Sequence, residues 1–227
     1  MAVNTEAYKA IKEELEAKNV TLVAVSKIQP VEAILKLYES GQRDFGENYV
    51  QELVDKQAQL PKDIRWHFIG HLQSNKVKYI APFVHLIHGV DSFKLLKEIN
   101  KEAAKNNRTI DVLLQVHIAQ EETKFGLDEE ELKNIYNKKS DGLQELKNVR
   151  ICGFMGMASF SDDSEKVRSE FKYLKSLFNW YADVPIANCK FSILSMGMSG
   201  DYTIAIEEGS TMVRIGSLLF GARNYAK

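Results

Sequence analysis

The stretch Thr21-Leu-Val-Ala-Val-Ser-Lys-Ile-Gln-Pro30 decides the fold. Its apolar and β-branched start predicts a buried strand, and Pro30 stops the strand because proline has no N–H to donate. Strand side chains alternate, so one face carries Thr21, Val23, Val25 and Lys27. Lys27 therefore ends an apolar face at the C-terminal tip of the strand. It is either a lysine that reaches solvent or a partly desolvated amine that forms a Schiff base with a carbonyl compound.

The composition indicates one soluble globular domain. The 227 residues are 44% hydrophobic and 27% charged, which suffices for one substantial core. The net charge of −1 gives no strong field that favours nucleic acid or an anionic membrane. Cys152 and Cys189 have neither CxxC nor metal-ligand spacing and are interpreted as free thiols in a reducing compartment. With no signal peptide or membrane-spanning run, we expect a cytoplasmic protein.

Strands and helices alternate along the whole chain. After a helix over 4–17, the expected strands are the opening stretch and then 43–48, 65–70, 86–90, 110–118, 149–157, 190–196 and 212–216. Strict alternation requires parallel strands with right-handed crossovers, and eight units suit a closed barrel better than an open sheet. We therefore predict an α/β fold, a single (β/α)8 TIM-type barrel with an extra N-terminal helix, over residues 1–227. Chemistry in such a barrel lies at the C-terminal ends of the strands.

Local patterns support several of the connecting helices. The clearest helix has apolar residues at the spacing of one helical face, namely Val167, Phe171, Leu174, Phe178 and Tyr181. Further helices are expected over 75–83 and 201–208, with a helical piece over 141–147. Asp91 or Ser92 is expected to cap the next helix, and Asp128 with Glu131 has the spacing of a capping box.

The loops after the last two strands are rich in small residues. They read Leu194-Ser-Met-Gly-Met-Ser-Gly-Asp201 and Arg214-Ile-Gly-Ser217. Exposed backbone N–H groups and a helix N-terminus attract anions, and barrels frequently bind phosphate with these two loops. Ser199, Gly216 and Ser217 are therefore phosphate candidates, although either loop alone is more often an ordinary turn. A phosphate anchor together with a Schiff-base lysine indicates pyridoxal 5′-phosphate (PLP) as the cofactor.

Arg214 is the third candidate group. Arginine stays protonated and only donates hydrogen bonds, so beside a pyridine nitrogen it would keep that nitrogen unprotonated. The ring would then be a weaker electron sink than a ring paired with a carboxylic acid. The alternative for Arg214 is a salt bridge across the barrel floor.

Six ordered stretches of the chain resemble the PLP homeostasis proteins, single-domain relatives of the PLP barrel of alanine racemase. They are Val25-Ser-Lys27, Phe45-Gly-Glu-Asn-Tyr-Val-Gln-Glu52, Trp66-His-Phe-Ile-Gly-His-Leu-Gln-Ser-Asn-Lys76, His88-Gly-Val-Asp-Ser92, Leu194-Ser-Met-Gly-Met-Ser199 and Gly209-Ser-Thr-Met-Val-Arg-Ile-Gly216. Together they reach nearly every strand end, so the resemblance covers the whole chain and implies a fold-type III PLP barrel.

The resemblance also implies a role for each site residue. Lys27 is the Schiff-base lysine and Arg214 faces the pyridine nitrogen. The phosphate lies among Ser199, Gly216 and Ser217, with backbone groups near Ser195 and Met196, and Asn48 lies within reach of the ring. His117 is a departure from the family pattern, where asparagine is more common.

Three functions remain open. The first is a non-enzymatic PLP carrier in vitamin B6 homeostasis, with PLP-dependent apoenzymes as candidate recipients. The second is a PLP-dependent amino-acid racemase, and the third is a barrel that holds another phosphorylated carbonyl compound. Racemisation needs an acid or base on each face of the substrate Cα. Lys27 serves one face, and His67 and His117 are imperfect candidates for the other. In the two-domain racemases that group comes from a dimer partner near an added β domain, which we do not expect here, so the carrier is favoured.

Other patterns do not indicate a site. His67 with His71, and His85 with His88, lack the helical spacing of a zinc pair, so no metal site is predicted. The basic residues over 75–78 are interpreted as a solvated helix face, and no glycine-rich nucleotide motif is present. We expect no nucleic-acid or membrane partner and a monomer or weak dimer.

Overall fold

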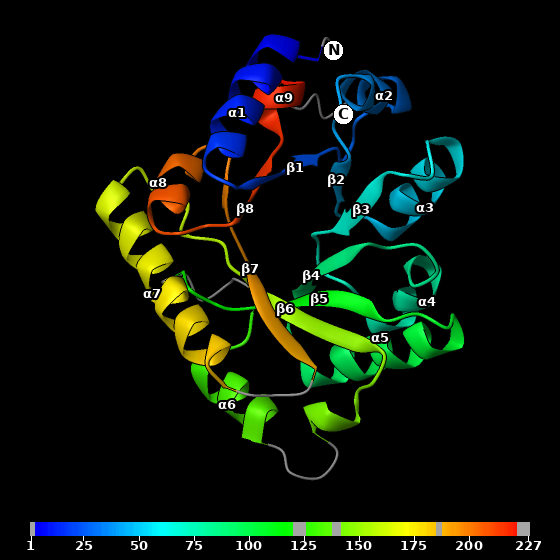
Figure 1. The fold of residues 1–227 in the computed structure, drawn as a ribbon, viewed down its shortest axis with the longest axis vertical. Helices are drawn as coiled ribbons and strands as arrows, with labels where there is room; N and C mark the ends of the chain where they lie inside the picture. Colours follow the sequence, from blue (N-terminus) through cyan, green and yellow to red (C-terminus); the bar gives the residue numbers. More distant parts are fainter. Residues whose placement is uncertain (1–2, 120–125, 138–141, 185–187, 222–227) are drawn as a thin grey trace.

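Eight parallel strands close into a barrel in sequence order, with β8 paired to β1. The computed structural model describes residues 3–119, 126–137, 142–184 and 188–221. Figure 1 shows the strands in the interior of the molecule and the helices around them. The strands are β1 (Thr21–Val25), β2 (Asp44–Glu47), β3 (Arg65–Phe68), β4 (Leu86–Val90), β5 (Ile110–Gln115), β6 (Val149–Met155), β7 (Cys189–Met198) and β8 (Met212–Ile215). The predicted (β/α)8 barrel is confirmed.

The helices cover the outside of the barrel. They are α1 (Thr5–Ala17), α2 (Val31–Glu39), α3 (Val50–Gln59), α4 (Val77–Ile80), α5 (Phe93–Lys105), α6 (Glu129–Asn137), α7 (Ser164–Ala182), α8 (Tyr202–Glu207) and α9 (Ser217–Phe220), with 3-10 turns η1 (Ser74–Lys76) and η2 (Leu143–Glu145). The leading helix α1 lies beside α9, where the Asn4 N–H donates to the Leu219 carbonyl at 2.8 Å (Figure 1). The helix expected over 75–83 is split between η1 and α4. Of the piece expected over 141–147, only η2 is helical among the described residues.

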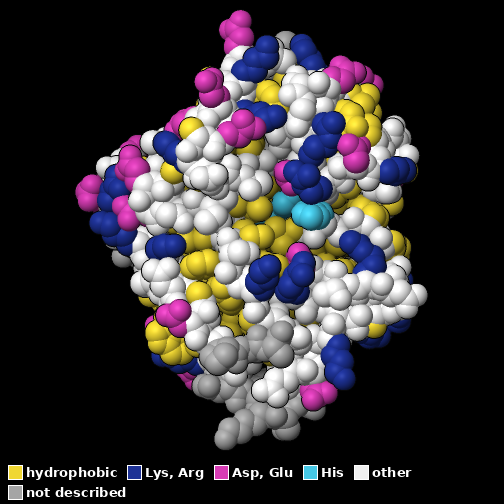
Figure 2. All heavy atoms as spheres, viewed as in Figure 1, with side chains coloured by type: hydrophobic (Ala, Val, Ile, Leu, Met, Phe, Trp, Pro, Cys, Tyr) yellow, Lys and Arg dark blue, Asp and Glu magenta, His cyan; other side chains and the backbone are white. Residues whose placement is uncertain are grey.

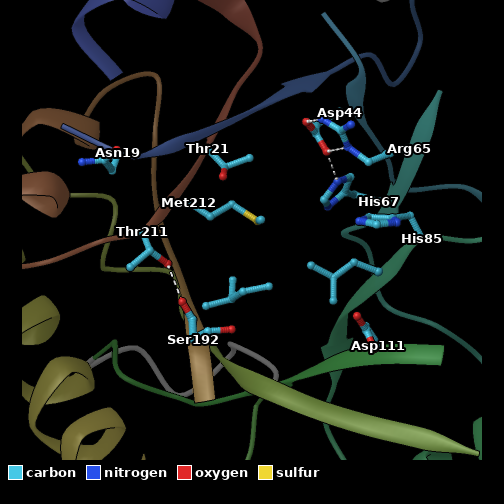
Figure 3. A pocket seen from close by; sticks show the side chains of 12 residues that line it. Asn19, Thr21, Asp44, Arg65, His67, His85, Asp111, Ser192, Thr211 and Met212 are labelled. Atoms are coloured by element: carbon cyan, nitrogen blue, oxygen red, sulfur yellow. Dashed lines mark hydrogen bonds and ion pairs between the residues drawn. The ribbon is translucent and has the colours of Figure 1, made fainter. Parts of the chain in front are cut away.

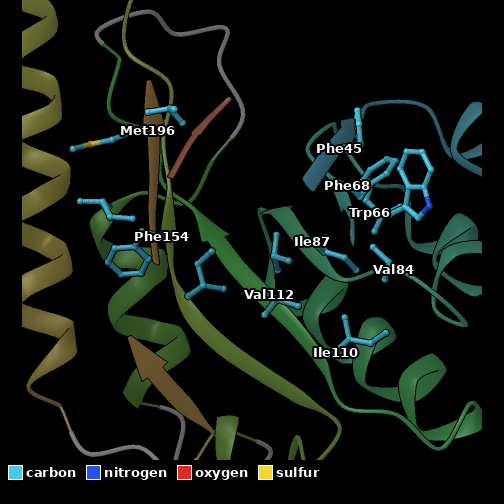
Figure 4. Close-up of a cluster of buried hydrophobic side chains, with 14 of the residues drawn as sticks. Phe45, Trp66, Phe68, Val84, Ile87, Ile110, Val112, Phe154 and Met196 are labelled. Carbon is cyan, nitrogen blue, oxygen red and sulfur yellow. The ribbon is translucent and has the colours of Figure 1, made fainter. Parts of the chain in front are cut away.

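Two apolar layers result from the alternation of strand side chains. Leu22 and Ala24 face outward into the large core between strands and helices, part of which Figure 4 shows around Phe45, Trp66 and Phe154. Val23 faces inward, in a smaller cluster that also contains Leu86, Leu113, Cys152, Met155 and Met212. The alternation predicted for β1 is therefore confirmed.

Several strand ends differ from the prediction. β1 stops at Val25, so Lys27 lies in the turn beyond the strand. β5 and β6 stop at Gln115 and Met155, earlier than predicted. β7 runs on to Met198, because a register shift opposite β8 lets the chain continue past Gly197. Gly197 has a φ of +95°, and a Cβ there would come within 2.6 Å of the Ala205 Cβ, so this bend requires glycine.

The capping predictions are confirmed. The Ser92 hydroxyl accepts from the Leu95 N–H at 3.3 Å at the start of α5. Asp128 and Glu131 form the reciprocal bonds of a capping box, with each backbone N–H donating to the other's carboxylate. At the start of α7, the Asp163 carboxylate accepts from the N–H groups of Glu165 and Lys166.

We predict that Asp163→Ala lowers the free energy of unfolding by about 1 kcal/mol, because two N–H groups at the start of α7 lose their acceptor. Denaturant unfolding followed by circular dichroism measures the change. Asp162→Ala is the matched control, since Asp162 is the exposed neighbour just outside the cap. Equal losses in the two variants would contradict the capping role.

Candidate functional site

A cavity of about 460 Å³ opens at the C-terminal ends of the strands. This volume lies within the ordinary range for small-molecule sites. Six of the eight predicted site residues line it: Lys27, Asn48, Ser199, Arg214, Gly216 and Ser217. Apolar side chains of Val25, Ile69 and Met157 line it as well, and the fully exposed Phe160 lies at its rim. The structure therefore brings together the lysine, the arginine and the small-residue loops.

Lys27 is held in a four-residue turn. The Gln29 N–H donates to the Ser26 carbonyl at 3.0 Å, so Lys27 and Ile28 are the two central residues. Ile28 has a φ of +64°, a conformation that normally favours glycine or asparagine and costs a β-branched residue about 1–2 kcal/mol. The Ile28 N–H donates to Glu52 Oε1 at 2.6 Å, which helps to hold this strained turn in place.

A buried ionic cluster lies beneath this turn. Lys56 of α3 donates to Glu47 Oε1 at 2.8 Å, to Glu52 Oε1 at 2.6 Å and to the Ser26 carbonyl at 2.7 Å. The Ser26 hydroxyl also donates to Glu47 Oε1 at 2.6 Å. Burial raises the pKa of Glu47 to about 7, against the opposing effect of the Lys56 ammonium. This cluster fixes the residues on both sides of Lys27, and no sequence pattern predicted it.

Asn48 brings an unsatisfied polar atom to the cavity. Its Oδ1 is buried and has no hydrogen-bond partner in the part of the chain that the structure describes, although Asn48 lines the cavity. The loop can lie close to β3 only because residue 70 is glycine: a Cβ there would come within 2.5 Å of the Asn48 carbonyl oxygen. A buried amide without a partner is costly, so Asn48 is poised to bond a ligand in the cavity.

The two small-residue loops meet at one edge of the cavity. The Gly216 N–H donates to the Ser199 hydroxyl at 3.2 Å, which joins the loop after β7 to the loop after β8. Ser217 follows directly and begins α9. The first of these loops is further held by the Met198 N–H, which donates to the Asp201 carboxylate.

Arg214 is buried and makes no salt bridge within the described residues. Its Nη1 donates to the Ser195 carbonyl at 2.8 Å and to the Ser195 hydroxyl at 2.7 Å, and its Nη2 donates to the Gly156 carbonyl at 3.0 Å. Burial lowers the pKa of Arg214 to about 10, which still leaves it protonated at neutral pH. The alternative of a salt bridge across the barrel floor is therefore wrong for the part of the chain that the structure describes.

Ser195 and Met196 are not among the residues that line the cavity. Because β7 extends to Met198, both lie within the strand and not in the loop that follows it. The Ser195 side chain points into the barrel toward Arg214, whereas Met196 packs in the outer core, where Figure 4 shows it on the side of α7. The Met196 carbonyl accepts from the Ser210 hydroxyl at 2.8 Å. The contact of backbone groups near these two residues with phosphate stays a prediction.

The two candidate histidines also lie away from the cavity lining. His67 lines a second cavity, at the N-terminal end of the barrel, and bonds to Asp44 and His88. His117 follows β5, where its backbone N–H donates to the Leu127 carbonyl at 3.0 Å. Neither lines the cavity that contains Lys27.

One group of metal-ligand type was also missed. Asp44, His67 and His85 place ligand atoms within 4.8 Å of one another. No short spacing along the chain joins these three residues. They come from β2, from β3 and from the residue just before β4, so only strand pairing brings them together.

Comparison with known proteins identifies the class. The sequence profile described as "Alanine racemase, N-terminal domain" matches residues 5–224. Alanine racemase of Clostridium difficile has the same barrel, with a TM-score of 0.72 over 99% of this chain and 59% of the racemase chain. At 14% identity this likeness concerns the fold alone. The fold and the matched profile therefore define a barrel of the alanine racemase N-terminal class.

Nearer relatives identify the family within this class. The pyridoxal phosphate homeostasis protein of Aquifex aeolicus is 44% identical over 90% of this chain and 87% of its own length. That of Haemophilus influenzae is 38% identical over 96% of this chain and 91% of its own. PipY of Synechococcus elongatus, whose structure has PLP bound, is 34% identical in sequence. Its structure has a TM-score of 0.85 over 95% of this chain and 99% of that chain. The chain belongs to the family of pyridoxal phosphate homeostasis proteins.

Among the helices of the described residues, none is both long enough and apolar enough to cross a membrane.

We predict that Glu47 makes the protein less stable as pH rises from about 4.5 to about 7. Its folded pKa of about 7 lies above the ordinary value of 4.5, so the folded state holds the proton more tightly. The contribution of Glu47 to the free energy of unfolding has its full value below pH 4.5. It is lost as the pH rises through 7, and the total loss is roughly 3 kcal/mol.

The measurement is the free energy of unfolding of the wild type and of Glu47→Gln across this pH range. Glutamine keeps an acceptor for Ser26 and Lys56 but does not titrate. The wild type should lose stability relative to the variant on raising the pH. A difference that is constant from pH 4 to 8 would contradict the raised pKa.

Proposed function

We propose that this protein binds PLP in the cavity at the C-terminal end of the barrel and takes part in cytoplasmic PLP homeostasis. The observation that carries the proposal is the convergence of Lys27, Asn48, Arg214 and the Ser199–Gly216 contact on one cavity. Support also comes from its relatives, which are named pyridoxal phosphate homeostasis proteins, and from the PipY structure, which has PLP bound.

The residues of the cavity fit such a cofactor. PLP supplies an aldehyde that condenses with an amine and a pyridine ring that withdraws electrons. Lys27 provides the amine, and its turn is fixed from below by the cluster of Glu47, Glu52 and Lys56. Asn48 offers a buried Oδ1 that has no partner among the described residues, and a hydrogen-bond donor on the ring would satisfy it.

The phosphate and the pyridine nitrogen of PLP would contact different residues of the cavity. Ser199 and Ser217 offer hydroxyls and, with Gly216, backbone N–H groups where two loops meet. We assign the phosphate to them and the pyridine side to Arg214. A protonated Arg214 donates hydrogen bonds and withholds a proton from the ring nitrogen, which keeps the ring a weak electron sink.

We also propose that the protein holds and releases PLP without efficient catalysis of its own. Racemisation needs a second acid or base opposite Lys27. The histidines proposed for this role from the sequence, His67 and His117, do not line the cavity. Apoenzymes of PLP-dependent enzymes are the recipients that this role requires.

We predict that Lys27 is the site of covalent attachment. Lys27→Ala, mixed with PLP and reduced with borohydride, should carry no pyridoxyl group by peptide mass mapping, whereas the wild type should carry one on Lys27. Lys76→Ala is the control, because Lys76 is an exposed lysine. An adduct of equal yield in Lys27→Ala would refute the assignment.

We predict that the phosphate supplies much of the affinity. Hydrogen bonds to a charged group are worth ~1.5–3 kcal/mol each. Losing two by the double change Ser199→Ala and Ser217→Ala should therefore weaken binding by about 10² or more. Equilibrium titration with PLP measures the change, and pyridoxal without phosphate should bind equally weakly to wild type and variant. Undiminished PLP affinity in the variant would sink the phosphate assignment.

We predict no efficient racemisation. PLP-loaded protein incubated with L-alanine in D₂O should give no more D-alanine than free PLP gives, measured by chiral chromatography. Lys27→Ala is the second control. Turnover near the ordinary enzyme range of ~1–10³ s⁻¹ would favour the racemase instead.

A further inference from the structure

A second cavity, of about 340 Å³, opens at the opposite, N-terminal end of the barrel. Its lining includes five titratable side chains from β2, β3 and β5 and from the residue just before β4 (Figure 3): Asp44, Arg65, His67, Asp111 and His85. The view in Figure 2 is taken from the same side as Figure 1 and shows histidine atoms at the surface beside Lys and Arg side chains. Nothing in the proposed cofactor function accounts for these residues.

A metal ion is not the best account of this group. Arg65 binds both oxygens of the Asp44 carboxylate, with Nε at 2.7 Å from Oδ1 and Nη2 at 2.5 Å from Oδ2. The guanidinium therefore already neutralises the carboxylate in the Asp44–His67–His85 group, and a bound cation would lie beside this positive charge. Asp44 is also hydrogen-bonded to His67, and this bond leads into the barrel.

A continuous chain of hydrogen bonds runs from Asp44 through the barrel to Arg214. Asp44 Oδ1 lies 2.9 Å from His67 Nε2, and His67 Nδ1 lies 2.9 Å from His88 Nε2. His88 Nδ1 lies 3.1 Å from the Ser195 hydroxyl, which lies 2.7 Å from Arg214 Nη1. β4 and β7 are not neighbours in the barrel, so the bond between His88 and Ser195 crosses its interior.

The two ends of this chain fix the direction of every bond in it. Arginine only donates and a carboxylate only accepts. His67 must therefore donate from Nε2 to Asp44, which leaves its Nδ1 to accept from His88 when His67 is neutral. His88 then accepts at Nδ1 from the Ser195 hydroxyl, and that oxygen accepts from Arg214. Every N–H and O–H points from Arg214 toward Asp44, with both histidines carrying their proton on Nε2.

The environment of the chain favours this arrangement. Its five residues are between 0 and 7% exposed. Burial, with a smaller contribution from the positive charge of Arg214, holds the pKa of His88 well below its usual range, so His88 is neutral. Burial alone would raise the pKa of Asp44, but the hydrogen bonds from Arg65 and His67 outweigh it and keep that pKa well below its ordinary value. The acceptor end of the chain is thus a permanent anion.

We propose that the chain Asp44–His67–His88–Ser195–Arg214 is a positioning network that orients Arg214 in the cofactor cavity. Through this network, the orientation of Arg214 depends on the charges carried by Asp44 and His67 at the opposite end of the barrel. Arg214 has only neutral oxygens as its described acceptors, so the oriented Ser195 hydroxyl is one of the few groups that fix its plane. The effect on the cofactor rests on the proposed function, but the direction of the chain does not.

Protonation of His67 would reverse part of the chain. His67 would then donate from Nδ1 to His88, His88 would donate from Nδ1 to Ser195, and the Ser195 O–H would lose its acceptor. Arg214 would face a reoriented hydroxyl. The charged and titratable groups that face His67 are Asp44 of β2, Arg65 of β3, His85 before β4 and His88 of β4.

The first test needs no cofactor. Heteronuclear NMR of the imidazole nitrogens reports which nitrogen of each histidine carries the proton. In the wild type at neutral pH we expect His67 and His88 to carry it on Nε2. In Asp44→Asn the fixed acceptor is gone, because an amide also donates, and both histidines should show a mixture of tautomers. A proton on Nδ1 of His88 in the wild type would overturn the proposal.

Asp111→Asn is the matched control. Asp111 lines the same cavity and pairs with Arg150 on the neighbouring strand, at 2.7 and 2.6 Å, as Asp44 pairs with Arg65. It makes no described bond to either histidine of the chain, so Asp111→Asn should leave both tautomers unchanged. Identical responses to Asp44→Asn and Asp111→Asn would also overturn the proposal. If Asp44→Asn fails to fold, Ser195→Ala tests the other end of the chain. The nitrogen chemical shift of His88 Nδ1 should then move to the value of an imidazole nitrogen that accepts no hydrogen bond. An unchanged chemical shift would contradict the chain.

The second test uses the PLP-loaded protein. The pH at which the absorbance of bound PLP changes should shift to lower pH in Asp44→Asn, because a negative charge linked to Arg214 has been removed. It should not shift in Asp111→Asn. If PLP does not bind at all, the proposed function fails while the NMR test still stands. If PLP binds and the midpoints of both variants equal that of the wild type, the positioning role is refuted.

Discussion

The hydrogen-bonded pairing of β1 with β8 closes the barrel, and the cofactor cavity depends on that closure. Thr21 lies opposite Met212 and Ala24 opposite Ile215, so the first and last strands of the fold run in register side by side. Lys27 follows one of these strands, and Gly216 follows the other. Groups separated by most of the chain thereby come to line one cavity. Without this pairing the lysine and the phosphate loops would lie at opposite edges of an open sheet.

The interior of this barrel is polar to an unusual degree. Barrels of this type are normally filled with layers of branched apolar side chains, whereas here His67, His88, Ser195 and Arg214 occupy inward positions beside a small apolar cluster. A buried polar group is tolerated only when it is hydrogen-bonded. Each of these four side chains has partners from other strands, so the polar interior ties together strands that are not neighbours in the barrel.

The sequence was sufficient for the barrel and for most of the cavity lining, because both follow from short-range rules. Alternation along β1 placed Lys27 on the inward face, and the small residues of the last two loops marked Ser199 and Gly216. Ser195 and Met196 do not line the cavity: both lie in the strand already predicted over 190–196, and the register shift that carries β7 on to Met198, which nothing local revealed, leaves them at least two residues short of its end. The partners of Lys56 and His88 could not be predicted either: each bond joins elements distant in sequence, and only the closed barrel determines which inward side chains meet.

The two ends of the barrel hold charge in different ways, and this difference explains why only one of them suits a ligand. At the N-terminal end, Asp44 and Asp111 each accept from Nε and Nη2 of an arginine on the next strand, so their charges are already balanced. At the C-terminal end, the described hydrogen-bond acceptors of Arg214 are all neutral oxygens, and Asn48 Oδ1 has no partner among the described residues. A folded protein keeps a buried charge without a hydrogen-bonded counter-ion, or a buried oxygen without a donor, at a cost in stability. An anionic ligand with polar ring substituents removes that cost, which is a physical reason for binding at this end of the barrel.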